Sequence, residues 1–335
     1  MATFYNEEFL GHIQEPFHPE SPERLKGIIQ MLQRHGLWKD IITSKTGKLE
    51  NLLLVHDENY IDFIKTCGEC NLTMDTRVHH ETYDIASLSA QCAVDAAAWS
   101  KEHTKPAFAL TRPPGHHAGP AYGMGFCYFN NISIAARYLR KHGDKKIAII
   151  DEDVHHGNGT QEIFKDDPSV LYISTHQLEI FPGTGKVTYV GEGPGEGFTL
   201  NMPFQSGCGD STFDVAFAEV IKPVVEQFEP DAILVSWGVD THYRDTLASL
   251  TLSSQGHLRQ AAELVRLSEI CDKRITFMLE GGYDIPALSE VVAGVIGATE
   301  GVDVPQEFTD VIGNSCLGRP TILRCKSIAS QYWDF

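Results

Sequence analysis

The chain has 335 residues, of which 42% are hydrophobic, 10% aromatic and 21% charged. This composition is typical of a globular protein with a sizeable core and excludes a largely disordered chain. The 45 acidic residues outnumber the 27 Lys and Arg residues, which gives a formal net charge of -18. Because such a charge repels phosphate backbones, we expect no direct binding to nucleic acid.

The sequence contains no recognisable targeting or membrane segment. Its first residues lack a basic start followed by an apolar run, and no stretch approaches the roughly 18 apolar residues of a membrane span. The eight cysteines are scattered, apart from Cys67 and Cys70, as is typical of thiols in a reducing compartment. We therefore expect a cytoplasmic protein without membrane association, and the oligomeric state stays open, a homo-oligomer included.

Helical segments alternate with short apolar runs along the chain. The first helix follows Ser21 as its N-cap, with Pro22 in its first turn and apolar residues at helical spacing through Leu32. Further helices are predicted at Ile85–His103, Asn130–His142, Phe213–Phe228, Gly256–Cys271 and Ile285–Thr299. Strands are predicted at Ala107–Leu110, Lys146–Asp151, Val170–Ser174, Ala232–Ser236 and Ile275–Leu279.

This alternation predicts an α/β fold with a central, mostly parallel sheet. Each predicted strand is apolar almost throughout, as expected when helices cover both faces of the sheet. No linker interrupts the pattern, so we expect one domain over residues 1–335. Gly183–Gly197 is expected to form a glycine-rich loop, and residues 300–335 a C-terminal segment that wraps over the domain.

Polar side chains follow four of the predicted strands at their C-terminal ends, where parallel sheets place their ligand sites. They are His116 and His117, then Asp151 to His156, then Asp240, and finally Tyr283. Structural roles alone rarely place such residues at four separate strand ends. We therefore expect these residues to form one site.

The segment Asp151-Glu152-Asp153-Val154-His155 is typical of a divalent-metal site. In an extended backbone alternate side chains share a side, so Asp151, Asp153 and His155 can converge. Asp240 follows Gly238 at the end of another strand and offers a third ligand; alone, it would more often be a helix cap. Catalytic zinc commonly keeps three protein ligands and one open position, and Asp153, His155 and Asp240 meet that count.

Two further groups can take part in proton transfer or carbonyl polarisation. The turn Pro113-Pro114-Gly115 presents His116 and His117, whose side-chain type suits acid and base catalysis near neutral pH. Gly281-Gly282 places Tyr283 on a flexible turn, where its hydroxyl could polarise a carbonyl. The simpler interpretations are a surface His pair and a buried packing Tyr.

Together these residues resemble the histone deacetylase superfamily, which includes acetylpolyamine amidohydrolases and has an arginase-like α/β fold. The similarity extends over most of the chain. It rests on His18-Pro-Glu-Ser-Pro-Glu-Arg24, Arg112-Pro-Pro-Gly-His-His117, Gly125-Phe-Cys-Tyr-Phe-Asn-Asn131, Asp153-Val-His-His-Gly-Asn-Gly-Thr160, Phe181-Pro-Gly-Thr-Gly185 and Glu280-Gly-Gly-Tyr283.

The resemblance implies a role for each residue of the site. Asp153, His155 and Asp240 would bind Zn²⁺, with Fe²⁺ as an alternative metal. His117 would be the general base and acid, oriented by Asn158, while His116 paired with Asp151 would give electrostatic support and Tyr283 would polarise the amide carbonyl. Gly125, Phe126 and Phe181 would line a narrow tunnel. A potassium ion would be held by Asp151, Asp153, His155, Ser174 and Thr175.

The implied function is a zinc-dependent deacetylase that converts acetyl-lysine in a peptide or protein to lysine and acetate. An amidohydrolase acting on acetylpolyamines or other small acylated amines is the main alternative, although Leu247 stands roughly where polyamine-selective relatives carry an acidic residue. An arginase-type ureohydrolase or an inactive acyl-lysine-binding module are minor alternatives.

Three features depart from the family pattern or stay unassigned. Glu152 replaces an apolar or aromatic residue and should point away from the metal, and Trp237 replaces a small or aliphatic one. Their effects do not follow from the sequence. Cys67 and Cys70, followed by His79 and His80, suggest a second, structural zinc site or a redox role as a hypothesis.

Overall fold

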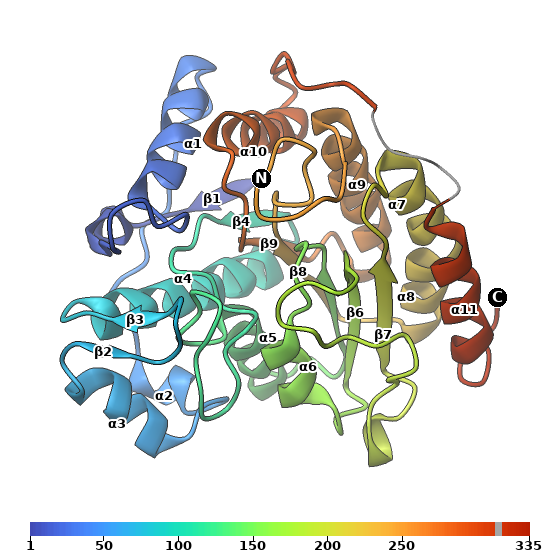
Figure 1. The fold of residues 1–335 in the computed structure, drawn as a ribbon, viewed down its shortest axis with the longest axis horizontal. Coiled ribbons are helices and arrows are strands. Elements are labelled where there is room, and N and C mark those ends of the chain that lie inside the picture. Colours follow the sequence, from blue (N-terminus) through green and yellow to red (C-terminus); the bar gives the residue numbers. More distant parts are fainter. Residues whose placement is uncertain (312–316) are drawn as a thin grey trace.

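The computed structural model describes residues 1–311 and 317–335, and a seven-stranded sheet runs through its centre (Figure 1). The strand order is β1-β4-β9-β8-β5-β6-β7, and every neighbouring pair is parallel. The strands are β1 (Ala2–Phe4), β4 (Ala107–Ala109), β5 (Ile147–Asp151), β6 (Val170–Gln177), β7 (Thr199–Phe204), β8 (Ala232–Trp237) and β9 (Ile275–Leu279). The expected α/β fold with a parallel central sheet is confirmed.

The five strands expected from their apolar runs all form. The two strands of this sheet that the sequence did not predict, β1 and β7, are its edges. β1 has only three residues, and β7 contains Asn201 and Pro203, which weaken its apolar pattern. Proline fits an edge strand, because an edge leaves one row of backbone groups without a strand partner.

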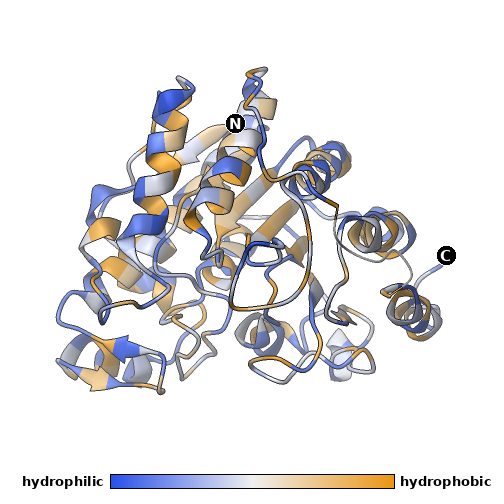
Figure 2. Ribbon diagram, turned by 45° about the horizontal axis from the view of Figure 1, so that its top comes forward, coloured by the Kyte–Doolittle hydropathy of each residue, from blue (hydrophilic) through white to orange (hydrophobic). Residues whose placement is uncertain are grey.

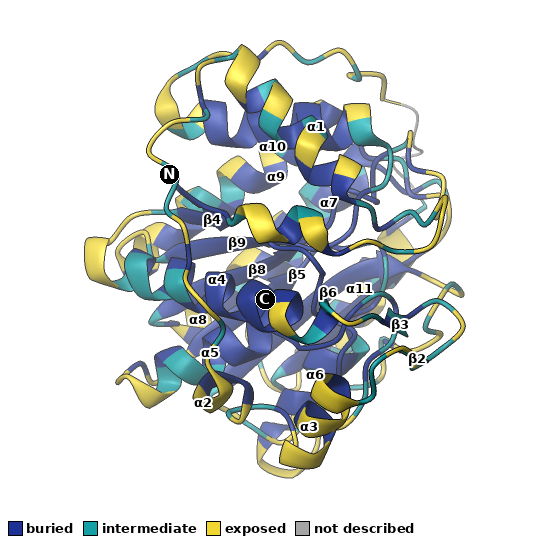
Figure 3. Cartoon of the chain, turned by 90° about the vertical axis from the view of Figure 1, so that its left-hand side faces the viewer, coloured by how far each residue is buried: buried dark blue, intermediate teal, exposed yellow. Residues whose placement is uncertain are grey.

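Helices cover both faces of the sheet (Figures 1 and 3). On one face α4 (Thr82–His103) packs against α5 (Asn131–Lys141) and on β4 and β9, while α6 (Asn158–Phe164) packs on β6. On the other face α1 (Pro22–Arg34) packs against α10 (Ile285–Glu300), α10 against α9 (Ser254–Leu267), and α9 against α7 (Asp210–Ala216). These elements include the helices that the sequence predicted.

The expected helix Phe213–Phe228 is one part of a longer helical segment. The longer segment consists of α7, the π-helical η3 (Phe217–Ile221) and α8 (Lys222–Phe228). Short 3-10 helices are η1 (Glu7–Gly11), η2 (Gly193–Gly195) and η4 (Ser268–Cys271). Side-chain caps fix the starts of three helices: Asn130 accepts from the N–H of Ser133, Ser253 from that of Gly256, and Asp284 from that of Ala287.

The core lies between the sheet and its two helix layers. Figure 2 shows that the central strands are hydrophobic, and Figure 3 shows that they are buried while the outer helix faces are exposed. All residues of β4, β5, β6, β7, β8 and β9 are buried. This pattern follows from helices covering both faces of a parallel sheet.

Several short elements lie outside the predicted pattern. They are α2 (Leu49–Leu52), α3 (Glu58–Thr66) and the hairpin of β2 (Cys70–Asn71) and β3 (Arg77–Val78). The C-terminal segment 300–335 contains the helix α11 (Arg319–Ala329), which packs on β7, although the sequence shows no clear helical periodicity there. Part of that segment, residues 312–316, lies outside the described residues.

Among the described residues, no helix is both long and apolar enough to cross a bilayer. The expectation of one domain over residues 1–335 stays a prediction. The sheet itself has a feature that bears on function: the chain continues from β5 to β6 and β7 on one side, but from β8 to β9 on the other. In open α/β sheets, such a reversal beside the C-terminal strand ends is where ligands bind.

Candidate active site

The four polar strand-end segments meet at the C-terminal edge of the sheet, around the reversal between β5 and β8. A cavity of about 200 Å³ opens there, and its lining brings together residues that follow β4, β5 and β9. The lining residues are Asp75, Pro114, His116, His117, Gly125, Phe126, Asp153, His155, Phe181, Leu247, Gly281 and Tyr283. The expected convergence of these residues is therefore present.

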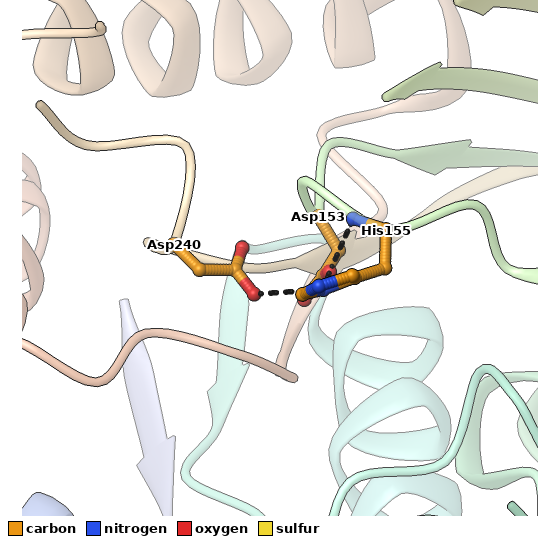
Figure 4. A group of neighbouring side chains, drawn as sticks. All are labelled: Asp153, His155 and Asp240. Atoms are coloured by element: carbon orange, nitrogen blue, oxygen red, sulfur yellow. Dashed lines mark hydrogen bonds and ion pairs between the residues drawn. The ribbon is translucent and has the colours of Figure 1, made fainter. Parts of the chain in front are cut away.

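Asp153, His155 and Asp240 form a compact set of three possible metal ligands (Figure 4). One ligand atom from each residue lies within 4.8 Å of the others. Nδ1 of His155 is 3.2 Å from Oδ1 of Asp153 and 3.3 Å from Oδ2 of Asp240. Asp153 and His155 follow β5 and Asp240 follows β8, so the set occupies the reversal in strand order.

The chemistry of this set fits a bound cation. Asp153 and Asp240 are both buried, and Oδ2 of Asp240 has no hydrogen-bond partner within the described chain. Burial raises the pKa of Asp240 to about 7, with Asp153 adding to the effect. Burial alone would lower the pKa of His155, but Asp153 and Asp240 outweigh it and raise that pKa to about 10. The two buried carboxylates favour positive charge between them, and a divalent cation would supply it.

Two glycines make room for these carboxylates. A Cβ atom on Gly281 would lie 2.0 Å from Oδ2 of Asp240, and one on Gly238 would lie 2.3 Å from Oδ2 of Asp153. The N–H of Gly281 donates to Oδ2 of Asp153 at 2.8 Å, and the N–H of Val154 donates to Oδ1 of Asp240 at 3.0 Å. The glycines are thus required for close approach of the backbone to the site.

His116 lies deep in the site and is held by carboxylates. Its Nδ1 is 3.1 Å from Oδ2 of Asp151, which also accepts the hydroxyl of Tyr172 at 2.9 Å. Its Nε2 is 3.8 Å from Oδ1 of Asp153. Burial opposes the charged form, but Asp151 and Asp153 outweigh burial and raise the pKa of His116 to about 10.

His117 has the opposite electrostatic environment. Burial lowers its pKa well below the ordinary value, and the neighbouring His116 and His155 lower it further. Its Nδ1 is 2.8 Å from Oδ1 of Asn158, and an N–H there can donate to that oxygen. The lone pair then lies on Nε2. The surroundings of the two adjacent imidazoles thus shift their pKa values in opposite directions, as separate acid and base roles require.

Tyr283 lines the cavity and its backbone is fixed on two sides. Its N–H donates to Oδ2 of Asp245 at 2.6 Å, and Nε of Arg24 donates to the carbonyl of Gly282 at 2.7 Å. The guanidinium of Arg24 also lies 5.0 Å from the centre of the Tyr283 ring. Burial raises the pKa of Tyr283 well above its ordinary value, so the phenol stays a hydrogen-bond donor.

Glu280 connects the two turns that carry the histidines and Tyr283, a role that the sequence did not indicate. Its Oε2 accepts the N–H of Gly115 at 2.7 Å and that of His116 at 3.3 Å. Its Oε1 accepts the hydroxyl of Ser236 at 3.0 Å. Burial raises the pKa of Glu280 to about 7. The only feature of the sequence that could have pointed to this role of Glu280 is its position directly before the Gly-Gly turn.

Arg24 and Arg112, which belong to two different motifs, form a buried ion cluster with Glu20 that the sequence also did not indicate. Nε of Arg112 lies 2.6 Å from Oε1 of Glu20, and Nη1 of Arg24 lies 3.4 Å from the same oxygen. Arg24 donates from Nη2 to the carbonyl of Glu280 at 2.6 Å. This cluster supports the turn that carries Tyr283.

The expected tunnel residues lie at the cavity. Gly125 has φ +56, and a Cβ there would lie 2.5 Å from Cδ2 of His117, so only glycine fits. The ring of Phe181 meets His117 edge-on at 5.1 Å, and that of Phe126 meets Tyr283 at 6.0 Å. The N–H of Phe126 donates to the hydroxyl of Thr76 at 2.9 Å, which ties the tunnel to the β2–β3 hairpin.

The residues expected to hold potassium lie on neighbouring strand ends. Ser174 is paired with Asp151 across β5 and β6, and the hydroxyl of Thr175 lies 3.4 Å from the carbonyl of Asp151. The hydroxyl of Ser174 is engaged with Nδ1 of His176 at 2.9 Å. Potassium binding stays a prediction.

The second metal site proposed for Cys67, Cys70, His79 and His80 receives no support from the geometry. The Sγ atoms of Cys67 and Cys70 are 2.7 Å apart. Within the described part of the chain, however, the only His, Cys, Asp or Glu group with ligand spacing is Asp153, His155 and Asp240. His80 instead lies 3.8 Å from Glu69.

Glu152 and Trp237 both lie in the core. Glu152 is buried, and its Oε1 has no hydrogen-bond partner among residues 1–311 and 317–335. Burial raises its pKa to about 8, with Asp151 adding to the effect. Trp237 packs edge-on against Phe108 and Phe277. The cavity lining includes Asp153 and His155 but neither Glu152 nor Trp237.

Comparison with known proteins decides the family. Residues 18–299 match the family model described as the histone deacetylase domain. The chain belongs to the histone deacetylase family. Family membership supports a deacetylase activity.

Individual relatives of this histone deacetylase family member cover nearly the whole chain. It is 40% identical over 309 residues to a protein of Archaeoglobus fulgidus named probable deacetylase, covering 90% of this chain and 86% of the relative. It is also 40% identical to histone deacetylase 14, chloroplastic, of Arabidopsis thaliana, covering 88% of this chain and 75% of the relative. The crystal structure of the HDA15 HD domain superimposes with a TM-score of 0.90 at 32% identity, covering 99% of this chain and 95% of that one.

Proposed function

We propose that this protein is a zinc-dependent deacetylase that hydrolyses the amide of acetyl-lysine in peptides or proteins to acetate and the free amine. The observation that carries the proposal is the set of Asp153, His155 and Asp240, two of which line a cavity that His117 and Tyr283 also line. A metal site alone supports many reactions. The neutral imidazole of His117 and the phenol of Tyr283, both beside the metal site, favour hydrolysis of an amide.

Asp153, His155 and Asp240 would hold the metal, with Zn²⁺ as the proposed ion and Fe²⁺ as the alternative. A metal held by three protein ligands lowers the pKa of water and polarises a carbonyl oxygen. A potassium ion held by the Asp151, Asp153, His155, Ser174 and Thr175 set remains part of the proposal.

His117 is the proposed base. With its Nδ1 hydrogen donated to Asn158, its Nε2 is free to take a proton from the attacking water. The same nitrogen then returns that proton to the amine as the C–N bond breaks. The lowered pKa of His117 suits this role, because a neutral imidazole accepts a proton and an imidazolium readily gives it back.

Tyr283 and His116 are the proposed supports for developing negative charge. The phenol of Tyr283 lines the cavity and would donate to the amide oxygen as that oxygen gains charge during attack. His116, held protonated by Asp151 and Asp153, places a fixed positive charge next to His117. Removing either group would reduce the stabilisation of the transition state without removing a proposed metal ligand.

The tunnel supports a linear aminoalkyl substrate. Gly125, Phe126 and Phe181 border the path to the metal set, which favours an unbranched chain such as that of acetyl-lysine. Leu247, which also lines the cavity, carries no charge to attract the second amine of a polyamine, although Asp75 is part of the same lining. An amidohydrolase of small acylated amines stays the second candidate. The described residues offer one group with metal-ligand spacing, which disfavours a two-metal ureohydrolase.

The test compares acetyl-lysine peptides, longer acyl-lysines and acetylated putrescine and spermidine as substrates of the zinc-loaded protein. Preferential release of acetate from the peptides supports the proposal. A preference for the small amines would replace it with the second candidate. No turnover on any substrate, with stoichiometric metal bound, would favour an acyl-lysine-binding module.

For the compartment and the partners we propose what the sequence led us to expect. We propose cytoplasmic location, no membrane and no direct nucleic-acid contact, with acetylated protein as the partner. The formal charge of -18 is suited to lysine-rich substrates, because opposite charges steer their encounter. Cell fractionation with an antibody to this chain tests the location.

A further inference from the structure

A row of hydrogen bonds leads from the proposed base to the molecular surface. Nδ1 of His117 lies 2.8 Å from Oδ1 of Asn158, and Nδ2 of Asn158 lies 3.2 Å from the hydroxyl oxygen of Tyr122. The hydroxyl of Tyr122 lies 2.5 Å from Oε2 of the exposed Glu162. We call this row of His117, Asn158, Tyr122 and Glu162 the relay.

The donors in the relay all point the same way. Glu162 is a carboxylate and can only accept, so the single hydrogen of Tyr122 goes to it. The oxygen of Tyr122 is then free to accept from the amide nitrogen of Asn158. Nδ2 of Asn158 also lies 3.4 Å from the carbonyl of His117 and 3.5 Å from Sδ of Met124, and both contacts favour the same amide orientation.

This direction has a consequence for His117. With its nitrogen engaged by Tyr122, Asn158 must present its oxygen to Nδ1 of His117. An oxygen acceptor requires the hydrogen on Nδ1, and the lone pair is then on Nε2. If the amide turned over, its NH₂ group would face Nδ1 and favour the opposite tautomer, whose Nε2 cannot accept a proton.

The local fold holds the relay in place. Asn158 and Glu162 are four residues apart on α6, so their side chains share one face of the helix. Gly119 and Tyr122 pair through a backbone hydrogen bond of 3.0 Å, and a Cβ on Gly119 would lie 2.3 Å from Cε1 of the Tyr122 ring. Burial, assisted by Glu162, raises the pKa of Tyr122, so its phenol stays a donor.

We propose that Tyr122 and Glu162 are positioning residues that fix the Nδ1–H tautomer of His117 through Asn158. This proposal rests on the proposed function, in which His117 is the base. Neither residue would touch substrate. Together they place the carboxylate of Glu162 behind the neutral Asn158–His117 pair, with the Tyr122 side chain between Glu162 and Asn158.

The test uses the metal-loaded full chain and two readouts. Nitrogen-15 chemical shifts of labelled histidine report the tautomer, with the His117 signals assigned by their loss in His117→Ala. Steady-state kinetics on an acetyl-lysine peptide separate kcat from KM. The variants are Tyr122→Phe, Glu162→Leu and Glu162→Gln. Tyr189→Phe is the matched control, because its hydroxyl donates to Glu192 at 3.1 Å outside the cavity lining.

We expect wild type and Tyr189→Phe to show His117 with its hydrogen on Nδ1. Tyr122→Phe and Glu162→Leu should show a mixture of tautomers and a kcat lower by about 3- to 10-fold, as for one lost hydrogen bond, with KM within about 2-fold. Glu162→Gln should lose less than Glu162→Leu, because its amide oxygen still accepts from Tyr122.

An unchanged His117 tautomer in Tyr122→Phe and Glu162→Leu overturns the proposal, whether or not kcat falls. A mixture of tautomers in wild type overturns it as well. If wild type releases no acetate from any peptide, the proposed function has failed, and the nitrogen-15 shifts still decide the positioning role by themselves.

Discussion

Oε1 of Glu20 lies 2.6 Å from Nε of Arg112, and both side chains are buried. Arg112 begins the turn that leads to the two histidines, and Glu20 precedes the helix that carries Arg24. The ion pair therefore joins the N-terminal segment to the site. Its effect on stability is the first testable consequence of the structure.

Glu20→Gln should destabilise the protein by about 3–5 kcal/mol, because it leaves Arg112 and Arg24 buried without their anionic partner. Burial would raise the pKa of Glu20, but Arg112 outweighs it and lowers that pKa from 4.5 to about 2. The contribution of Glu20 is thus complete above about pH 4.5 and is lost as pH falls toward 2. Urea unfolding at several pH values measures it. The loss should be largest at neutral pH, and equal stability of both proteins there would contradict the account.

Tyr283→Phe should lower kcat by about 100- to 1000-fold, because it removes a donor to the developing oxyanion. It should leave the metal content unchanged, since Tyr283 is not among the three proposed ligands. Kinetics and metal analysis on one sample check both statements. Tyr138→Phe, on α5 where the ring stacks on His142, is the control and should behave like wild type. Near-native turnover of Tyr283→Phe would refute the assigned role.

Asp240→Ala should abolish stoichiometric metal binding and, with it, activity. It removes one of three converging ligands and leaves two, too few for a stable site of this kind. Metal content after dialysis against a weak chelator provides the measurement. Asp214→Ala, which removes a half-exposed carboxylate paired with Arg259, is the control. One metal ion per chain retained in Asp240→Ala would show that Asp240 is not a ligand.

Glu152→Met should stabilise the protein by about 1–3 kcal/mol, because a buried carboxyl whose Oε1 has no hydrogen-bond partner is replaced by an apolar chain of similar length. Thermal unfolding at neutral pH measures the change. The metal content should stay at the wild-type value, since Glu152 does not line the cavity. A lower melting temperature would indicate that Glu152 has a polar partner, such as an internal water.

The elements predicted well from the sequence are those that carry their own periodicity. β5, β8 and β9 are continuous apolar runs, and their observed bounds differ from the predicted ones by at most one residue. The strand-end rule then places Asp153, His155 and Asp240 together before any coordinates are known. The convergence of these three residues can therefore be predicted from the order of the strands along the chain.

The missed features depend on tertiary contacts. β1 is too short for any pattern, and the pairing of its three residues with β4 decides its conformation. α11 mixes polar and apolar residues without a clear helical period and forms where it packs on β7. Glu280 and Glu20 act through partners more than 90 residues away, Gly115 and Arg112, so no local pattern reveals those contacts.

The most direct measurement of the central claim is acetate release from an acetyl-lysine peptide by the purified protein, with and without one equivalent of Zn²⁺. We expect no release from the metal-free protein, turnover after Zn²⁺ is added, and loss of that turnover in Asp240→Ala. Turnover that is equal with and without metal, or absent although Zn²⁺ is bound at one ion per chain, would contradict that claim.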